Sequence, residues 1–295
     1  MSEMAAASAG SPMPRRRRRR RIRPFRLFMH AMLVVVVVVA DFPLAWIVVT
    51  ALKPDQEIAR YPPTLIPNTF TLDNFENLFR ISPFASYLTN SIIVATGATF
   101  LTVVLGTLAA YSFARFHYRF LHGIGELSLF AYMVPPILVL VPIAQVITAL
   151  GLANNLASLM VLYTAILLPF ALWVLRSYFL GYTLDLEQAA MVDGCTRFGA
   201  FRRVVIPQAM PGLISTAVFT FNAAWSEYLF ASTLMSTPKT LTLSPGLALL
   251  LNQTGVYSWG ILMAASVIVV MPVIILFIIA QRQLVSGLGA GAVKG

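Results

Sequence analysis

Residues 27–52 read LFMHAMLVVVVVVADFPLAWIVVTAL, and Asp41 is the only Asp, Glu, Lys or Arg among them. A helix needs about 20 mostly apolar residues to cross the hydrocarbon core of a membrane, where it satisfies its backbone groups without water. A secretory signal would have a shorter apolar region, of about 7 to 15 residues, before a small-residue cleavage site. This stretch lacks that pattern, so we predict a retained transmembrane helix.

The rest of the chain repeats this pattern. Hydrophobic residues make up 58% and charged residues only 11%, against about 25% charged in a soluble domain. Five further apolar stretches lie at 86–113, 123–150, 156–180, 204–234 and 259–281. We therefore predict an all-α, polytopic membrane protein with one six-span domain over residues 27–281.

Prolines modify two of these regions. The connector 53–85 holds five prolines, a density that forbids a continuous helix, and we interpret it as an outer loop. In the third stretch, Pro135, Pro136 and Pro142 predict a kinked span. A second outer loop is predicted at 235–258.

The net charge of +10 is concentrated before the first span, at Arg15 to Arg21, Arg23 and Arg26. Bases that flank a span stay in the cytoplasm, so we predict that residues 1–26 are cytoplasmic. We also predict that this segment is disordered. Attraction to anionic lipid is a secondary reading, and nucleic-acid binding is disfavoured. Of the 21 bases, four fall on the predicted outer side, namely Lys53, Arg60, Arg80 and Lys239. The tail 282–295 and both termini are therefore predicted to be cytoplasmic.

Residues 181–203 form a predicted cytoplasmic loop before the fifth span. Most of the informative segment 185–207, which reads DLEQAAMVDGCTRFGAFRRVVIP, lies in this loop. Asp185 followed by Gln188 resembles a capping box, and Gly194 suits the left-handed stop of a short helix. Thr196 can cap a second helix, with an apolar face formed by Phe198, Phe201, Val204 and Val205. Small side chains at Ala189 and Ala190 would let another surface approach closely. The residues alone leave a docking helix and a simple connecting helix equally open.

This segment resembles the EAA coupling motif in membrane subunits of ATP-binding-cassette importers. The motif positions are occupied, at the right spacing, by Gln188, Ala189, Ala190, Gly194, Val204, Ile206 and Pro207. The resemblance implies a helix that fits a cleft on a separate ATPase subunit. Its coupling residues would be Glu187, Gln188, Ala189, Ala190, Asp193, Gly194 and Pro207. The motif Glu is replaced by Gln188, so either Glu187 substitutes in pairing with the ATPase or that contact is weaker.

Weaker motifs are similar to the second permease of maltose-type carbohydrate importers. They are Trp225-Ser-Glu-Tyr-Leu-Phe-Ala231, Leu52-Lys53-Pro54 and the ending Gly-Ala-Gly-Ala-Val-Lys-Gly295. This resemblance implies the type I importer permease fold, a bacterial inner-membrane location, and a sugar, polyol or glycerol-phosphate solute. It implies a second, non-identical permease, two copies of an ATPase that bind ATP and Mg²⁺, and an extracytoplasmic binding protein. The outer loop over Thr237 to Tyr257 would contact that binding protein, and this chain would hold no cofactor.

Charged groups inside spans are costly, about 2.5 to 3.5 kcal/mol on insertion scales, so each needs a reason. Glu227 could line the solute path or serve as a buried structural partner, and the sequence leaves both open. Asn222, Trp225 and Ser226 are further path candidates because sugar sites combine polar side chains with aromatic platforms. Packing and hydrogen bonds between helices are the alternative for these three residues.

The sequence disfavours catalysis by this chain. Its single cysteine, Cys195, excludes an internal disulfide, and the three histidines lack the spacing of metal ligands. No nucleophile elbow and no phosphate-binding loop occur, so the ATPase must be another chain. The rival classes are a membrane-embedded enzyme and an ion-coupled secondary transporter. The latter needs buried ionisable relays, for which only Asp41 and Glu227 are candidates.

Overall fold

The computed structural model describes residues 24–116, 119–181, 184–253 and 259–292. Every regular element in these ranges is helical, as predicted. The predicted disordered segment lies outside the described residues, apart from its last three positions. The chain divides into two units, Met1–Trp46 and Ile47–Gly295, each of which is described by itself.

The first unit contains most of α1, which runs over Pro24–Ala51. Its apolar length Phe28–Ala51 is long enough to cross a membrane, which confirms the first predicted span. The rings of Phe42 and Trp46 stack along it with centroids 6.1 Å apart. By itself, the described part of the first unit does not cover the valine run of this helix.

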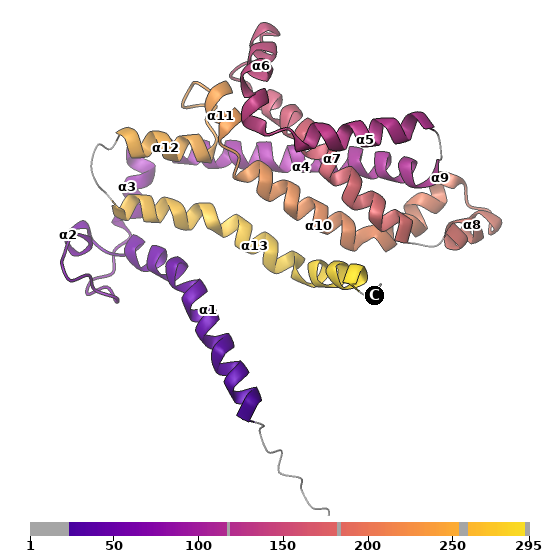
Figure 1. Ribbon diagram of the computed structural model, residues 1–295. Coiled ribbons are helices and arrows are strands. Elements are labelled where there is room, and N and C mark those ends of the chain that lie inside the picture. Colours follow the sequence, from indigo (N-terminus) through magenta and orange to yellow (C-terminus); the bar gives the residue numbers. More distant parts are fainter. Residues whose placement is uncertain (1–23, 117–118, 182–183, 254–258, 293–295) are drawn as a thin grey trace, which may run out of the picture. The chain divides into compact units, whose positions relative to one another are not determined.

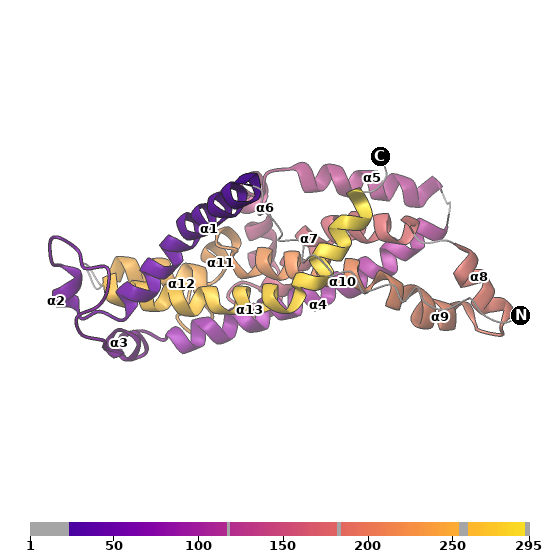
Figure 2. The same ribbon diagram turned by 90° about the horizontal axis from the view of Figure 1, so that it is seen from below.

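Four helices build the centre of the second unit (Figures 1 and 2). They are α4 (Phe84–Arg115), α7 (Leu156–Gly181), α10 (Ile206–Trp225) and α13 (Trp259–Ala292). Small residues bring α4 and α7 close together: a Cβ on Gly106 would stand 3.0 Å from that of Ala171. Helix contacts in membranes rely on such small residues, because lipid supplies no hydrophobic drive for association.

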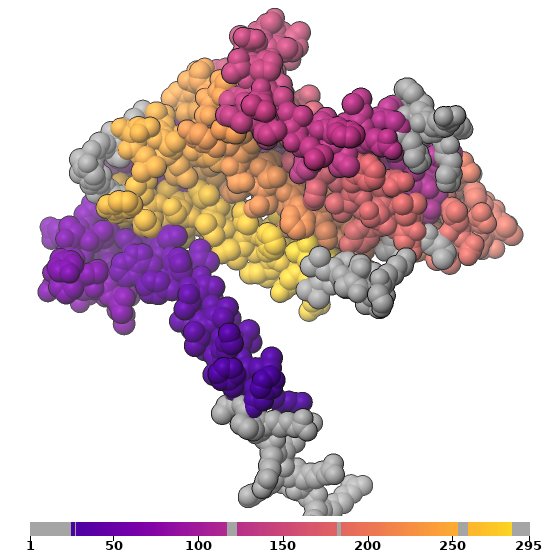
Figure 3. All heavy atoms as spheres, in the orientation of Figure 1, coloured from indigo at the N-terminus to yellow at the C-terminus, as the bar shows by residue number. Residues whose placement is uncertain are grey.

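The third predicted span is broken more sharply than a kink. It forms α5 (Arg119–Met133) and α6 (Pro136–Ala149), which meet at 104°. Pro135 adopts φ −56° and ψ 128°, because a residue that precedes a proline is driven out of the helical region. Figure 3 shows α6 standing out from the rest of the second unit. The described residues hold five helices able to span a membrane, or six if this bent pair counts as one.

Other boundaries also differ from the prediction. The fifth span was expected over 204–234, but a helical run formed by α9 (Arg197–Ala200), a π-helical turn (Phe201–Val205) and α10 ends at Trp225. Helix α11 (Leu229–Leu234) follows after a break.

The predicted loops contain short helices. The proline-rich connector holds α2 (Asp55–Ile58) and α3 (Asp73–Ile81), and it has no continuous helix, as expected. The second outer loop holds α12 (Leu243–Gln253), which the sequence analysis missed. Helix α13 also continues to Ala292, so most of the predicted tail is helical.

Candidate functional site

The predicted coupling segment forms α8 (Leu184–Val192) and the turn after it, at one end of the four-helix bundle (Figure 1). Helices α3 and α12 lie at the opposite end. Gly194 has φ +90°, as its role as a left-handed stop requires. The amides of Gly194 and Cys195 donate to the carbonyls of Met191 and Ala190 at 3.1 and 3.0 Å. This pair of bonds is a Schellman motif, which ends the helix abruptly.

Two helix caps were predicted in this segment, and the structure shows one of them. Thr196 accepts a hydrogen bond from the Gly199 amide at 3.1 Å and so caps α9, as predicted. Asp185 was predicted as the cap of the first helix, but it lies inside the first turn of α8. There its charge still favours the positive end of the helix dipole. The structure buries Phe201 and Val205 of the predicted apolar face, whereas Phe198 is 69% exposed.

Most of the motif residues are uncovered. Within the described residues, exposed side chains or backbone occur at Gln188, Ala189, Asp193, Gly194 and Pro207, and Ala190 is half-buried. The apolar side chains of Leu186 and Val192 beside them are 50% and 87% exposed. A short, rigidly ended helix with exposed small and apolar residues has the character of a contact surface.

Glu187 behaves differently from its neighbours. Its side chain is 5% exposed, and its Oε2 accepts from Nε of Arg115 at 2.9 Å. Its Oε1 accepts from the hydroxyl of Tyr111. The carboxylate therefore faces this chain's own spans, rather than the surface on which an ATPase would lie. The substitution of Glu187 for the motif Glu in an outward contact has no support in this geometry.

The translocation candidates separate into two pairs. Trp225 is buried, donates from Nε1 to the carbonyl of Val269 at 3.2 Å, and stacks on Phe221. Glu227 accepts from the amides of Phe230 and Ala231 at 2.8 and 3.1 Å, so its carboxylate caps α11.

Two further hydrogen bonds complete this region. Glu227 also accepts from the hydroxyl of Tyr163 on α7. Asn222 and Ser226 are exposed, and the Ser226 hydroxyl bonds to the carbonyl of Asn222 at 2.8 Å. Trp225 and Glu227 thus have structural partners, and only Asn222 and Ser226 present an open face.

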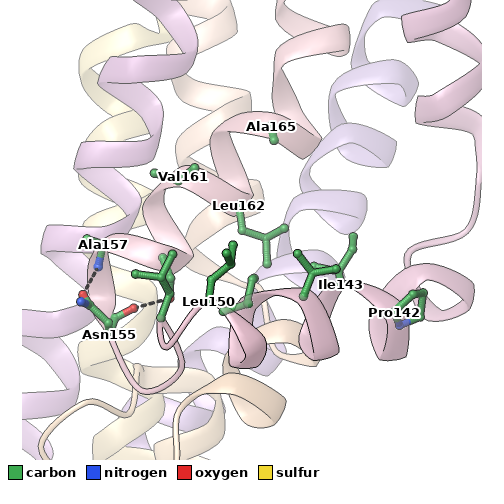
Figure 4. Close-up of a pocket in the computed structure, with 12 residues that line it drawn as sticks. Pro142, Ile143, Leu150, Asn155, Ala157, Val161, Leu162 and Ala165 are labelled. Carbon is green, nitrogen blue, oxygen red and sulfur yellow. Dashed lines mark hydrogen bonds between the residues drawn. The ribbon is translucent and has the colours of Figure 1, made fainter.

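A cavity of about 530 Å³ lies between α6 and α7 (Figure 4). Apolar side chains such as Ile143, Val161 and Leu162 line it. Its polar residues are already engaged: Asn155 accepts from the amide of Ala157, and the Ser158 hydroxyl bonds to the Asn155 carbonyl. A sugar needs convergent hydrogen-bonding groups, so this cavity does not suit one.

The residues that hold the predicted outer loop 235–258 could not be recognised from the sequence. Asn154, with φ +58°, accepts from the amides of Ser236 and Thr237 at 3.1 and 3.3 Å. Asn90 on α4 donates to the carbonyls of Lys239 and Leu241 at 2.8 and 2.9 Å. The loop residues that Asn90 and Asn154 bind are distant from them in the sequence. Locally, only the left-handed turn at Gly151–Asn154 marks this region. Among the described residues, no group of three possible metal ligands occurs.

Fold and site together define a helical, multi-pass membrane protein that presents a short, exposed helix at one end of its bundle. Comparison with known proteins agrees: residues 102–289 match the family described as binding-protein-dependent transport system inner membrane component. This chain belongs to that family, the permease subunits of ATP-binding-cassette importers. The predicted resemblance is confirmed, and these comparisons give no support to the ion-coupled alternative.

Relatives cover nearly the whole chain. An inner membrane ABC transporter permease protein of Escherichia coli is 36% identical over 92% of this chain and 97% of its own. The sulfoquinovosyl glycerol permease of Agrobacterium fabrum is 38% identical over 86% and 89%. The trehalose/maltose permease of Thermococcus litoralis is 34% identical over 89% and 94%.

Solved structures agree on the fold. A chain of a bacterial ABC transporter involved in alginate import is similar with a TM-score of 0.77. It is 18% identical, and the alignment covers 88% of this chain and 96% of that one. The predicted importer permease fold is therefore confirmed.

Proposed function

We propose that this chain forms half of the translocation pathway of an importer for a sugar, polyol or glycerol-phosphate-type solute. Support for the solute class comes from relatives whose names refer to sulfoquinovosyl glycerol, diacetylchitobiose and trehalose. Support for ATP-driven coupling comes from one observation: the exposed α8, ended by the Schellman turn at Gly194. Such a helix can enter a cleft on another protein without rearranging.

The proposed assembly contains a second, non-identical permease, two copies of an ATPase and an extracytoplasmic solute-binding protein. ATP and Mg²⁺ bind to the ATPase, and this chain catalyses no reaction. One solved relative of this fold is a transporter in complex with a periplasmic protein that carries an alginate pentasaccharide. In the proposed topology the chain lies in a bacterial inner membrane with both termini in the cytoplasm. The end of the bundle with α8 then faces the ATPase, and α12 lies outside.

Co-purification tests the docking role. Ala189 is exposed on α8, so Ala189→Trp adds bulk at the contact surface without filling this chain's own core. We expect the variant to reach the membrane and bind the second permease, while ATPase recovery falls about tenfold or more, as at a disrupted interface hot spot. The matched control is Ala131→Trp, an exposed alanine on α5. Equal ATPase recovery with Ala189→Trp and native protein would contradict the proposal.

A further inference from the structure

Glu187 is the only buried residue of α8. The other side chains of this helix are exposed or half-buried, so packing contributes little to holding α8 against the spans. Both oxygens of the carboxylate are instead engaged by α4, one by the Arg115 guanidinium and the other by the Tyr111 hydroxyl. The attachment of α8 to α4 therefore rests largely on one carboxylate.

Arg115 joins a third helix to this contact. Its guanidinium also donates to the carbonyl of Phe179, near the end of α7, at 3.3 Å. The ring of Tyr111 packs against those of Phe179 and Phe201, with centroids 6.0 and 4.5 Å away. These rings keep water from the ion pair, and a charge-assisted bond is stronger in such an environment.

The same helix α4 holds the outer loop at its other end. Asn90 donates to two loop carbonyls, and the Ser91 hydroxyl accepts from the amide of Leu243 at 2.8 Å. Asn90 and Arg115 both belong to α4, so these two attachments stand about 38 Å apart along one helix. Helix α4 contains no proline, so it lacks one common cause of a kink between the two attachments.

We propose that Glu187 and Arg115 are a positioning pair that transmits movement of α8 along α4 to the outer loop at 239–243. This inference rests on the proposed function, in which an ATPase moves α8. Glu187 acts within the permease, so its role differs from the ATPase contact that the coupling motif implies. The polar attachments at both ends make α4 the direct connection between the coupling helix and the loop.

The test follows the outer loop while the ATPase is trapped. Lys239 is exposed and only its carbonyl is used by Asn90, so Lys239→Cys in a Cys195→Ser background places one thiol on the loop. The assembled importer is labelled with a membrane-impermeant maleimide, with and without Mg-ATP and vanadate. With the pair intact, we expect trapping to change the labelling rate about fivefold, the size of a typical coupling between sites.

Glu187→Gln and Arg115→Met should each bring that ratio close to one while the ATPase still co-purifies. The reversed pair, Arg115→Glu with Glu187→Arg, should recover at least part of the response, which a merely local structural role would not do. Asp185→Asn is the matched control, because Asp185 is an exposed acid on the same helix. If the single variants fail to reach the membrane, the reversed pair alone decides the matter.

Three results would overturn the inference: a native response in Glu187→Gln, a reversed pair no better than the single variants, or no response in the native chain. Each of these, with the ATPase still bound, contradicts the positioning pair and leaves the proposed docking intact. Absence of an ATPase from the native assembly would contradict the proposed function itself, and this inference with it.

Discussion

The amide nitrogen of Cys195 donates to the carbonyl oxygen of Ala190 at 3.0 Å, across the left-handed Gly194. A Cβ at Gly194 would meet nothing within 4 Å, so substitution there strains only the backbone. We expect Gly194→Ala to destabilise the turn by about 1 to 2 kcal/mol, and Gly194→Asn by less, because Asn tolerates this region. ATPase co-purification should fall for Ala and largely persist for Asn. Native recovery with Gly194→Ala would argue against a need for this turn.

Glu227→Ala removes the cap of α11 and the acceptor of the Tyr163 hydroxyl. We expect a loss of about 1 kcal/mol in stability, typical of a lost helix cap, measured as thermal unfolding of the purified complex. Ser226→Ala is the control, since that hydroxyl bonds only its own helix and is exposed. If Glu227→Ala instead kept native stability and abolished uptake, the residue would line the solute path.

Asn90→Ala leaves the carbonyls of Lys239 and Leu241 without their donor. The loss of partners for such groups costs about 1 to 3 kcal/mol, so the loop should open more often. Trypsin added from the outer side should then cut faster after Lys239. Thr89→Ala is the neighbouring control, because the Thr89 hydroxyl bonds within its own helix. Equal cutting rates in both variants would show that Asn90 does not hold the loop.

We expect the stability of the loop that follows α1 to depend on pH. Hydrogen bonds to Glu57 from the Thr64 hydroxyl, at 2.6 Å, and from the Asn68 amide, at 3.0 Å, lower the pKa of this carboxyl below its usual 4.5. Because the pKa is lower in the folded state, the ionised carboxylate stabilises the loop above pH 4.5. This contribution disappears as the pH falls through the lowered pKa.

Hydrogen exchange should therefore show faster opening of the Asn68 amide in acid, after correction for the intrinsic rate. In Glu57→Gln, the Asn68 amide should exchange faster already at neutral pH, and acid should no longer accelerate its exchange. The control Glu76→Gln changes an exposed acid on α3 and should keep the acid response of the Asn68 amide. A response that persisted in Glu57→Gln would assign the titration to another group.

Local chemistry explains what the sequence could predict. Apolar length predicted the spans, and the special backbone of Gly194 and the hydroxyl of Thr196 predicted where helices stop and start. These signals need no knowledge of distant residues. The inward direction of Glu187 could not be predicted, because its partner Arg115 is 72 positions away in the sequence.

The same reason applies to the other differences. The open choice for Glu227 depended on Tyr163, a partner 64 positions distant. Helix α12 lies in a segment whose prolines and polar residues resemble a loop, and its position depends on contacts with α4. The prolines predicted a disturbance in the third span, but its 104° angle depends on how α5 and α6 pack, which their sequence does not specify.

Whether α8 enters a separate ATPase is tested most directly by a photo-activated cross-linking residue at position 188. Gln188 is exposed, so we expect the fold to tolerate a cross-linking side chain at this position. In membranes that contain the assembled importer, we predict a covalent adduct with the ATPase subunit from position 188 and none from position 131 on α5. An adduct from position 188 with an extracytoplasmic protein, or with lipid alone, would contradict the account.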